Sequence, residues 1–235
     1  MVTVFGSSNS IDWVESTFTE NLKRYGEWSS VAINNNGEAL ACALISNNQS
    51  SYGILYCPNI NLNTWTQLTE TEIPFIYNVN WQCVSINDNG QALACNDSNG
   101  VWYCSKVGVS SWIQVTPPFD FNSVSIANNG KAIAYSKVAG VKYSPDADLG
   151  QWSDVTPNLP LPYTLGALGV VINDAGQALL ANSQYGLWYN SNTGVESWIQ
   201  ITSETSDFFT GLLWRSVSIN NNGNAMACAT GDTGV

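Results

Sequence analysis

The sequence predicts an all-β fold: a five-bladed β-propeller of four-stranded antiparallel blades, closed by half-blades from the N- and C-terminal ends. Two short apolar strands around a polar turn recur five times in the 235 residues. The copies are 53, 40, 46 and 47 residues apart, measured between Val31, Val84, Val124, Val170 and Val217. A period of about 40 to 50 residues with strand-like content is typical of propeller blades. No segment shows a sustained helical period with capping residues.

Each copy begins with a strand in which apolar and small residues alternate, as in Val84, Ser85 and Ile86. Alternation with a period of two predicts a strand, and small side chains suit inner strands that crowd around an axis. The turn that follows is rich in Asn and ends in Gly, and both residues tolerate positive φ, which favours a hairpin. The five turns begin at Asn34 and its equivalents, and we expect them to form a ring on one face. The second strand reads ALAC or a variant of it.

The third and fourth strands complete each copy. The third begins at a glycine and has a tyrosine as its second-last residue, as in GVWYC from Gly100. The fourth has the pattern W-x-x-x-T, and its tryptophans are Trp13, Trp65, Trp112, Trp152 and Trp198. Because these rings recur at one position of every blade, we expect them to pack between blades.

These strands give one domain over residues 1–235. Complete blades are expected over 28–69, 81–116, 121–156 and 167–202. Residues 1–17 supply strands three and four of the closing blade, and residues 214–235 supply its strands one and two. Pairing the two half-blades would hide the strand edges that each would otherwise expose.

The hairpin between the third and fourth strands resembles that of Asp-box (BNR, sialidase-type) repeat propellers, in a degenerate form. Tyrosine and tryptophan are nine residues apart in four copies, and Ser105 and Ser191 occupy the position of the family's serine. The Asp position of the box holds other residues: Ile60, Val107, Ala147 and Thr193. The resemblance implies a propeller fold and a structural role for the box, away from any active site.

The composition excludes several function classes. The net charge is −11 and the pI is about 4.1, so the surface repels phosphate backbones and anionic lipids. We therefore expect neither nucleic-acid nor membrane binding. The sequence contains no histidine, which removes Ser-His-Asp and Cys-His nucleophiles and the usual catalytic zinc sites.

We predict no catalytic residues, no metal site and no cofactor. In every copy, the residue between the repeated valine and isoleucine of the inner strand is not a carboxylate. Asp88 and Asp174, the nearest carboxylates, fall in the turns that follow. Asp146 and Asp148 lack the further oxygen ligands that calcium requires. The six cysteines form no CxxC motif, and we expect free thiols, which favour a cytoplasmic origin without assigning a compartment. Residues 1–12 lack the features of a secretory signal, and no stretch is long and apolar enough for a membrane helix.

Aromatic side chains three residues before the anchoring valines are the candidate ligand-binding residues: Trp28, Trp81, Phe121 and Trp214. They lie where the linker from the preceding blade arrives. A ring at this place either presents an apolar platform to a sugar or peptide, or packs against the adjacent blade.

The expected function is therefore a non-enzymatic, multivalent recognition module that binds a glycan or a protein, with lectin-like sites at the blade junctions. A protein-interaction or structural scaffold is the first alternative. A glycoside hydrolase or sialidase-type enzyme is the second; against it, Arg24 and Arg215 are the only arginines available for a sialic acid carboxylate. The oligomeric state is left open.

Removing residues 1–17 tests how the propeller closes. We expect the truncated chain to aggregate or to lose cooperative unfolding, because two strands of the C-terminal half-blade would have no partners. Size-exclusion chromatography and thermal unfolding measure both effects. A truncated chain that stays monomeric and keeps its melting temperature would contradict closure by the two half-blades.

Overall fold

The computed structural model describes residues 3–5, 13–15, 27–44, 53–60, 64–73, 79–156, 167–182, 186–201, 213–223 and 226–231. Four antiparallel four-stranded sheets follow one another along the chain, as expected. Blade 1 contains β3 (Glu27–Ile33), β4 (Ala39–Leu44), β5 (Ile54–Cys57) and β6 (Thr66–Gln67). Blade 2 contains β7 (Trp81–Ile86), β8 (Ala92–Asn96), β9 (Val101–Cys104) and β10 (Ile113–Gln114).

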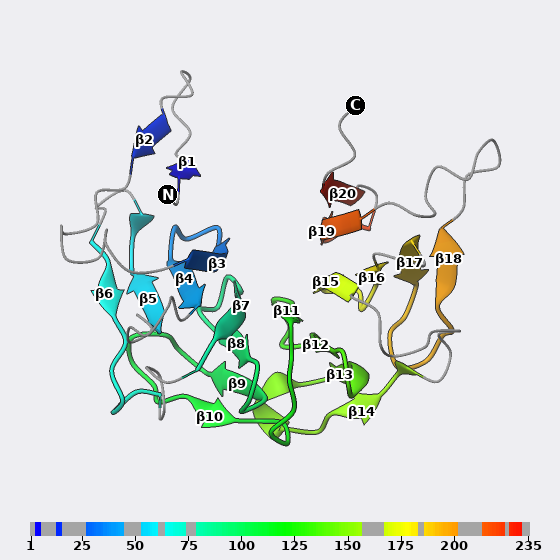
Figure 1. Ribbon diagram of the computed structural model, residues 1–235, viewed down its shortest axis with the longest axis horizontal. Helices are drawn as coiled ribbons and strands as arrows, with labels where there is room; N and C mark the ends of the chain where they lie inside the picture. Colours follow the sequence, from blue (N-terminus) through cyan, green and yellow to red (C-terminus); the bar gives the residue numbers. More distant parts are fainter. Residues whose placement is uncertain are drawn as a thin grey trace.

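The next two sheets repeat this order. Blade 3 contains β11 (Ser123–Ile126), β12 (Ala132–Ser136), β13 (Gly140–Ser144) and β14 (Ser153–Asp154), with the 3-10 turn η2 (Ala147–Leu149) in its outer hairpin. Blade 4 contains β15 (Ala167–Ile172), β16 (Ala178–Asn182), β17 (Gly186–Asn190) and β18 (Ile199–Ile201). Figure 1 shows the blades in an arc, with β3, β7, β11 and β15 toward its inside. The described part of the chain has no helix with the length and hydropathy needed to cross a membrane.

The two ends of the chain form separate two-stranded sheets. β1 (Thr3–Phe5) pairs with β2 (Trp13–Glu15), and β19 (Leu213–Ile219) pairs with β20 (Met226–Gly231). They lie at opposite ends of the arc, and no ladder joins them among the described residues (Figure 1). The closing blade, the count of five blades and the domain boundaries therefore stay predictions.

The hydrophobic core lies between blades rather than inside one sheet. All five residues of β8 and all five of β12 are buried, because a neighbouring blade covers each face. One cluster joins Leu40 and Ile54 of blade 1 to Trp81 and Val84 of blade 2. Further clusters join blade 2 to blade 3 and blade 3 to blade 4. The strands are apolar on both faces because both faces contact other blades.

Small polar residues link the inner strands across the blade junctions. The hydroxyl of Ser30 accepts a hydrogen bond from the Val84 amide at 3.3 Å, and Ser85 accepts one from Ile126 at 3.2 Å. Ser123 accepts a hydrogen bond from Val170 at 3.1 Å. These side chains fit between closely spaced strands and satisfy amides that the edge of each sheet leaves unpaired.

The Asn-rich turns form a second set of links, which we call the turn belt (residues 34–37, 87–90, 127–130 and 173–176). The Asn87 amide group donates to Gln91 Oε1 at 2.7 Å and to Ala127 O of the next blade at 2.9 Å. Its Oδ1 accepts from the amides of Asn89 and Gln91. Asn34 and Asn173 make the equivalent contacts to the following blades. The described turns therefore act as structural joints between adjacent blades, and the full ring of five turns stays a prediction.

Asn87→Ala tests the turn belt. We expect the free energy of unfolding to fall by about 2–4 kcal/mol, because the change removes two accepted and two donated hydrogen bonds at a buried site. Urea denaturation measures the loss. Asn89→Ala is the control: its side chain makes one exposed bond, to Asn128 O, and should cost about 1 kcal/mol or less. Equal losses for the two variants would contradict a special role for Asn87.

Candidate functional site

Two of the four aromatic residues predicted to bind a ligand are buried between blades. Trp81 is 0% exposed and Phe121 is 1% exposed, and both rings belong to the clusters between blades. This corrects the prediction for these two residues, because the adjacent blade covers the rings that a sugar would have to contact. Trp28 is half-buried, and the side chain of Trp214 lies outside the described residues.

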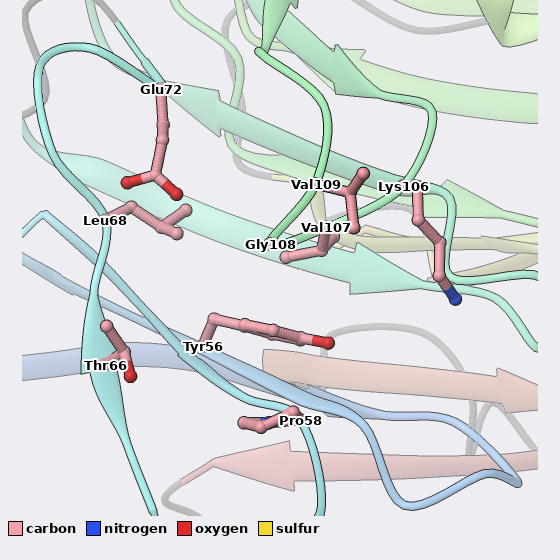
Figure 2. Close-up of a pocket in the computed structure, with 9 residues that line it drawn as sticks. All are labelled: Tyr56, Pro58, Thr66, Leu68, Glu72, Lys106, Val107, Gly108 and Val109. Atoms are coloured by element: carbon pink, nitrogen blue, oxygen red, sulfur yellow. The ribbon is translucent and has the colours of Figure 1, made fainter.

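Two clefts instead open on the outer side of the blade junctions. The first cleft lies between blades 1 and 2 and has a volume of about 440 Å³ (Figure 2). Blade 1 and the segment that follows β6 line one side of the cleft, and the β9–β10 hairpin of blade 2 lines the other. The lining residues are Tyr56, Pro58, Thr66, Leu68, Glu72, Lys106, Val107, Gly108 and Val109.

The second cleft lies between blades 3 and 4 and has a volume of about 390 Å³. Its lining comes from the outer part of blade 3 and from Gly194 in the β17–β18 hairpin of blade 4. The residues are Tyr143, Pro145, Gln151, Trp152, Ser153 and Gly194.

The two clefts are copies of one site. Each has a Tyr-x-Pro sequence at the end of strand three and a small hydroxyl residue after the strand-four tryptophan, which are Thr66 and Ser153. Each is completed by a glycine in the next blade's hairpin, Gly108 or Gly194, five residues after that blade's own tyrosine. The junction between blades 2 and 3 differs, because Tyr103 is followed by Ser105 and the facing hairpin has Asp148 in place of glycine. The same residues therefore form the site at the junctions between blades 1 and 2 and between blades 3 and 4, but not at the junction between blades 2 and 3.

A close contact between tyrosine and glycine sets the shape of both clefts. A Cβ atom on Gly108 would lie 2.7 Å from Cε1 of Tyr56, and one on Gly194 would lie 2.8 Å from Cε1 of Tyr143. Both glycines have positive φ, at 76° and 91°. The hairpin can approach the ring of the preceding blade only because these positions lack a side chain.

Hydrogen bonds hold the Tyr56 ring in place beneath the first cleft. Its hydroxyl donates to Glu38 Oε1 at 3.1 Å, and the Asn34 amide donates to Glu38 Oε2 at 2.7 Å. Lys106 Nζ from blade 2 lies 3.3 Å from Glu38 Oε1. Burial disfavours the charged carboxylate, but the bonds from Asn34, Lys106 and Tyr56 outweigh it and lower the pKa of Glu38. Burial and the Glu38 charge raise the pKa of Tyr56 to about 12, so its hydroxyl stays a donor.

The other carboxylates and thiols that could support chemistry have structural contacts or are buried. Asp88 accepts hydrogen bonds from Asn35 and Asn128 within the turn belt, and Asp146 caps η2. Burial raises the pKa of Cys42 well above its usual range, and burial raises the pKa of Cys104 to about 11. These thiols stay protonated at neutral pH. No group of three or more metal-ligating side chains occurs among the residues that the structure describes.

Sequence reasoning missed the cleft residues, although a signal for them was present. The pairs Gly108-Val109 and Gly194-Val195 break the Asp-box pattern at the same position in blades 2 and 4. Val109, which lines the first cleft, is 81% exposed, and Val195, next to Gly194 of the second cleft, is 75% exposed. The glycine four residues before the strand-four tryptophan distinguishes these two hairpins from that of blade 3, which has Asp148 at this position.

Known structures share this architecture. The extracellular domain of BT4673 from B. thetaiotaomicron has a TM-score of 0.60 at 10% identity, covering 87% of this chain and 26% of that one. YCF48 bound to D1 peptide has a TM-score of 0.58 at 12% identity, covering 88% and 63%. The WD40 domain of Neurospora crassa Pan2 has a TM-score of 0.58 at 10% identity, covering 96% and 66%.

The fold is a β-propeller. Its four-stranded antiparallel blades agree with these structures in arrangement, and this chain spans only about a quarter to two thirds of their lengths. No family model matches the propeller, and no curated protein matches its sequence. The resemblance to Asp-box repeats therefore remains a likeness of sequence pattern.

Gly108→Ala and Gly194→Ala test the contact that shapes the clefts. We expect each to lower the free energy of unfolding by about 2–4 kcal/mol, from the positive φ and the overlap with the tyrosine ring. Gly130→Ala is the matched control, because its φ is 84° and the nearest atom to a new Cβ is 3.5 Å away. Chemical denaturation should show a smaller loss for the control. Equal losses for the three variants would contradict a packed tyrosine–glycine contact.

Proposed function

We propose that this propeller is a non-enzymatic recognition module that binds a protein segment in the two clefts at its blade junctions. One observation carries the proposal: the same cleft, with the same Tyr, Pro and Gly positions, is built twice on one scaffold. The cleft is not a general property of the repeat, because the junction between blades 2 and 3 has Ser105 in place of the proline and Asp148 in place of the glycine. Two copies of a weak site increase the overall affinity for a ligand that reaches both.

The character of the clefts supports a protein ligand. Their volumes fall in the lower part of the range for binding pockets, about 300–1,000 Å³, and suit a few side chains of an extended segment. Tyrosine and proline line both clefts, and the exposed Val109 adds apolar surface to the first. Exposed apolar residues beside a pocket are typical of interaction sites.

The sequence alone favoured a glycan as the ligand. Sugar recognition would use exposed aromatic faces, and the burial of Trp81 and Phe121 removes two of the four expected platforms. A peptide complex among the similar propellers, YCF48 bound to D1 peptide, is consistent with a peptide ligand. We propose no catalytic activity, since Asp88, the carboxylate closest to the inner strand of blade 2, is held by neighbouring turns.

Filling the clefts tests the proposal. The full chain is screened against a displayed random-peptide library and a glycan array, and hits are measured by calorimetry. Thr66→Trp and Ser153→Trp place a large side chain at equivalent exposed positions in the two clefts. We expect peptide hits that lose about tenfold or more in affinity in each variant.

Ile113→Trp is the control, because Ile113 has the same position after its tryptophan in blade 2 and does not line a cleft. It should leave peptide affinity unchanged. Saturable sugar binding that survives both cleft variants, or peptide binding insensitive to them, would overturn the proposal.

A further inference from the structure

We infer that the first cleft receives a cationic side chain of the protein ligand, an arginine or a lysine, whereas the second cleft receives an uncharged one. This inference rests on the proposed function and names the chemistry that distinguishes its two sites. It follows from what differs between two otherwise equivalent clefts: a fixed carboxylate lines the first.

Glu72 supplies that carboxylate, and its surroundings fix its position. Its Oε2 atom accepts hydrogen bonds from the backbone amide of Thr69 at 2.8 Å and from the Thr69 hydroxyl at 3.0 Å. Its backbone carbonyl accepts from the Trp112 amide of blade 2 at 2.8 Å. Both side-chain bonds from Thr69 go to Oε2, so the carboxylate is oriented in advance and a cation can bind it without the cost of ordering a mobile side chain.

The rest of the first cleft suits the methylene chain and the charged group of a lysine or arginine. Figure 2 shows the Glu72 carboxylate on one side of the cleft and the Tyr56 ring across from it. A cation between them would meet the carboxylate on one side and an aromatic face on the other. The exposed lining residues Pro58 and Val109 offer apolar surface to the methylene groups of lysine or arginine.

The cation already present in the cleft does not occupy this place. Lys106 Nζ is paired with Glu38 Oε1 at 3.3 Å and donates to Asn89 O at 3.4 Å. Figure 2 shows it at the end of the cleft away from Glu72. Glu38 therefore compensates the Lys106 charge, and the Glu72 charge stays available to a ligand.

The second cleft lacks a charged lining residue. At its mouth it presents Gln151 and Ser153 beside Tyr143 and Trp152. Placing a cation there would remove its hydration without a charged partner, which is unfavourable. The net charge of −11 further favours a cationic partner by long-range attraction. The ligand is thus a basic segment with one cation and one uncharged anchor.

The test uses two small probes and the full chain. N-acetyl-arginine methylamide and its citrulline analogue, a neutral isostere, are titrated into ¹⁵N-labelled protein. We expect the arginine probe to shift the amides of Gly108 and Glu72 and to bind about fivefold or more tightly than the citrulline probe, with the difference reduced by added salt. Glu72→Gln should abolish the difference and keep an oxygen for the Thr69 bonds.

Glu70→Gln is the matched control: Glu70 is an exposed acid two residues away that does not line the cleft. It should retain the preference for arginine, and Ser153→Trp should retain it as well. Equal affinities for the two probes in wild-type protein, no shift at the cleft, or a preference that persists in Glu72→Gln would each overturn the inference. If Glu72→Gln does not fold, the wild-type preference and its salt dependence decide.

The two proposals fail differently. In one outcome, the selected peptides lose affinity in Thr66→Trp and Ser153→Trp but contain no arginine or lysine and bind Glu72→Gln unchanged. That result would refute the inference and leave the proposed function standing. Peptides insensitive to both tryptophan variants would refute the proposed function itself.

Discussion

The contact between neighbouring blades is the constraint on which the rest of this structure depends. A four-stranded sheet with two apolar faces cannot bury either face alone, so each blade is stable only between two others. β8 and β12 are buried over their whole lengths for this reason. The serines of the inner strands and the asparagines of the turn belt then hold adjacent blades in register by hydrogen bonds.

The same contact creates the candidate site. The outer strands are short, two residues in β6 and two in β14, so the junctions are less completely filled there than near the inner strands. A hairpin from the next blade reaches over Tyr56 or Tyr143 where glycine allows it. A cleft remains beside each contact. The candidate sites therefore lie at the outer edges of the blade junctions, where the packing between blades is incomplete. The glycine–tyrosine contact distinguishes the junctions that have a cleft.

Much of the fold could be predicted because strand periodicity, turn residues and repeat spacing are local properties of the chain. Asn87 shows this well, since an Asn-rich turn predicts a hairpin wherever it occurs. The ligand-binding residues were harder to predict, because a ring such as Trp81 has the same sequence pattern whether a ligand or a neighbouring blade covers it. Its burial is decided by residues of blade 1, more than 25 positions earlier in the sequence.

The sequence by itself determined an all-β repeat chain of four-stranded units, the place of the turns and the acidic character of the surface. These follow from residue types and their spacing. Only the tertiary structure decided that Trp81 and Phe121 are core residues and that Gly108 and Gly194 face tyrosines of the preceding blade. It also brought Glu72 and Tyr56 to one cleft. The physical reason is that each of these facts depends on how one blade packs against the next.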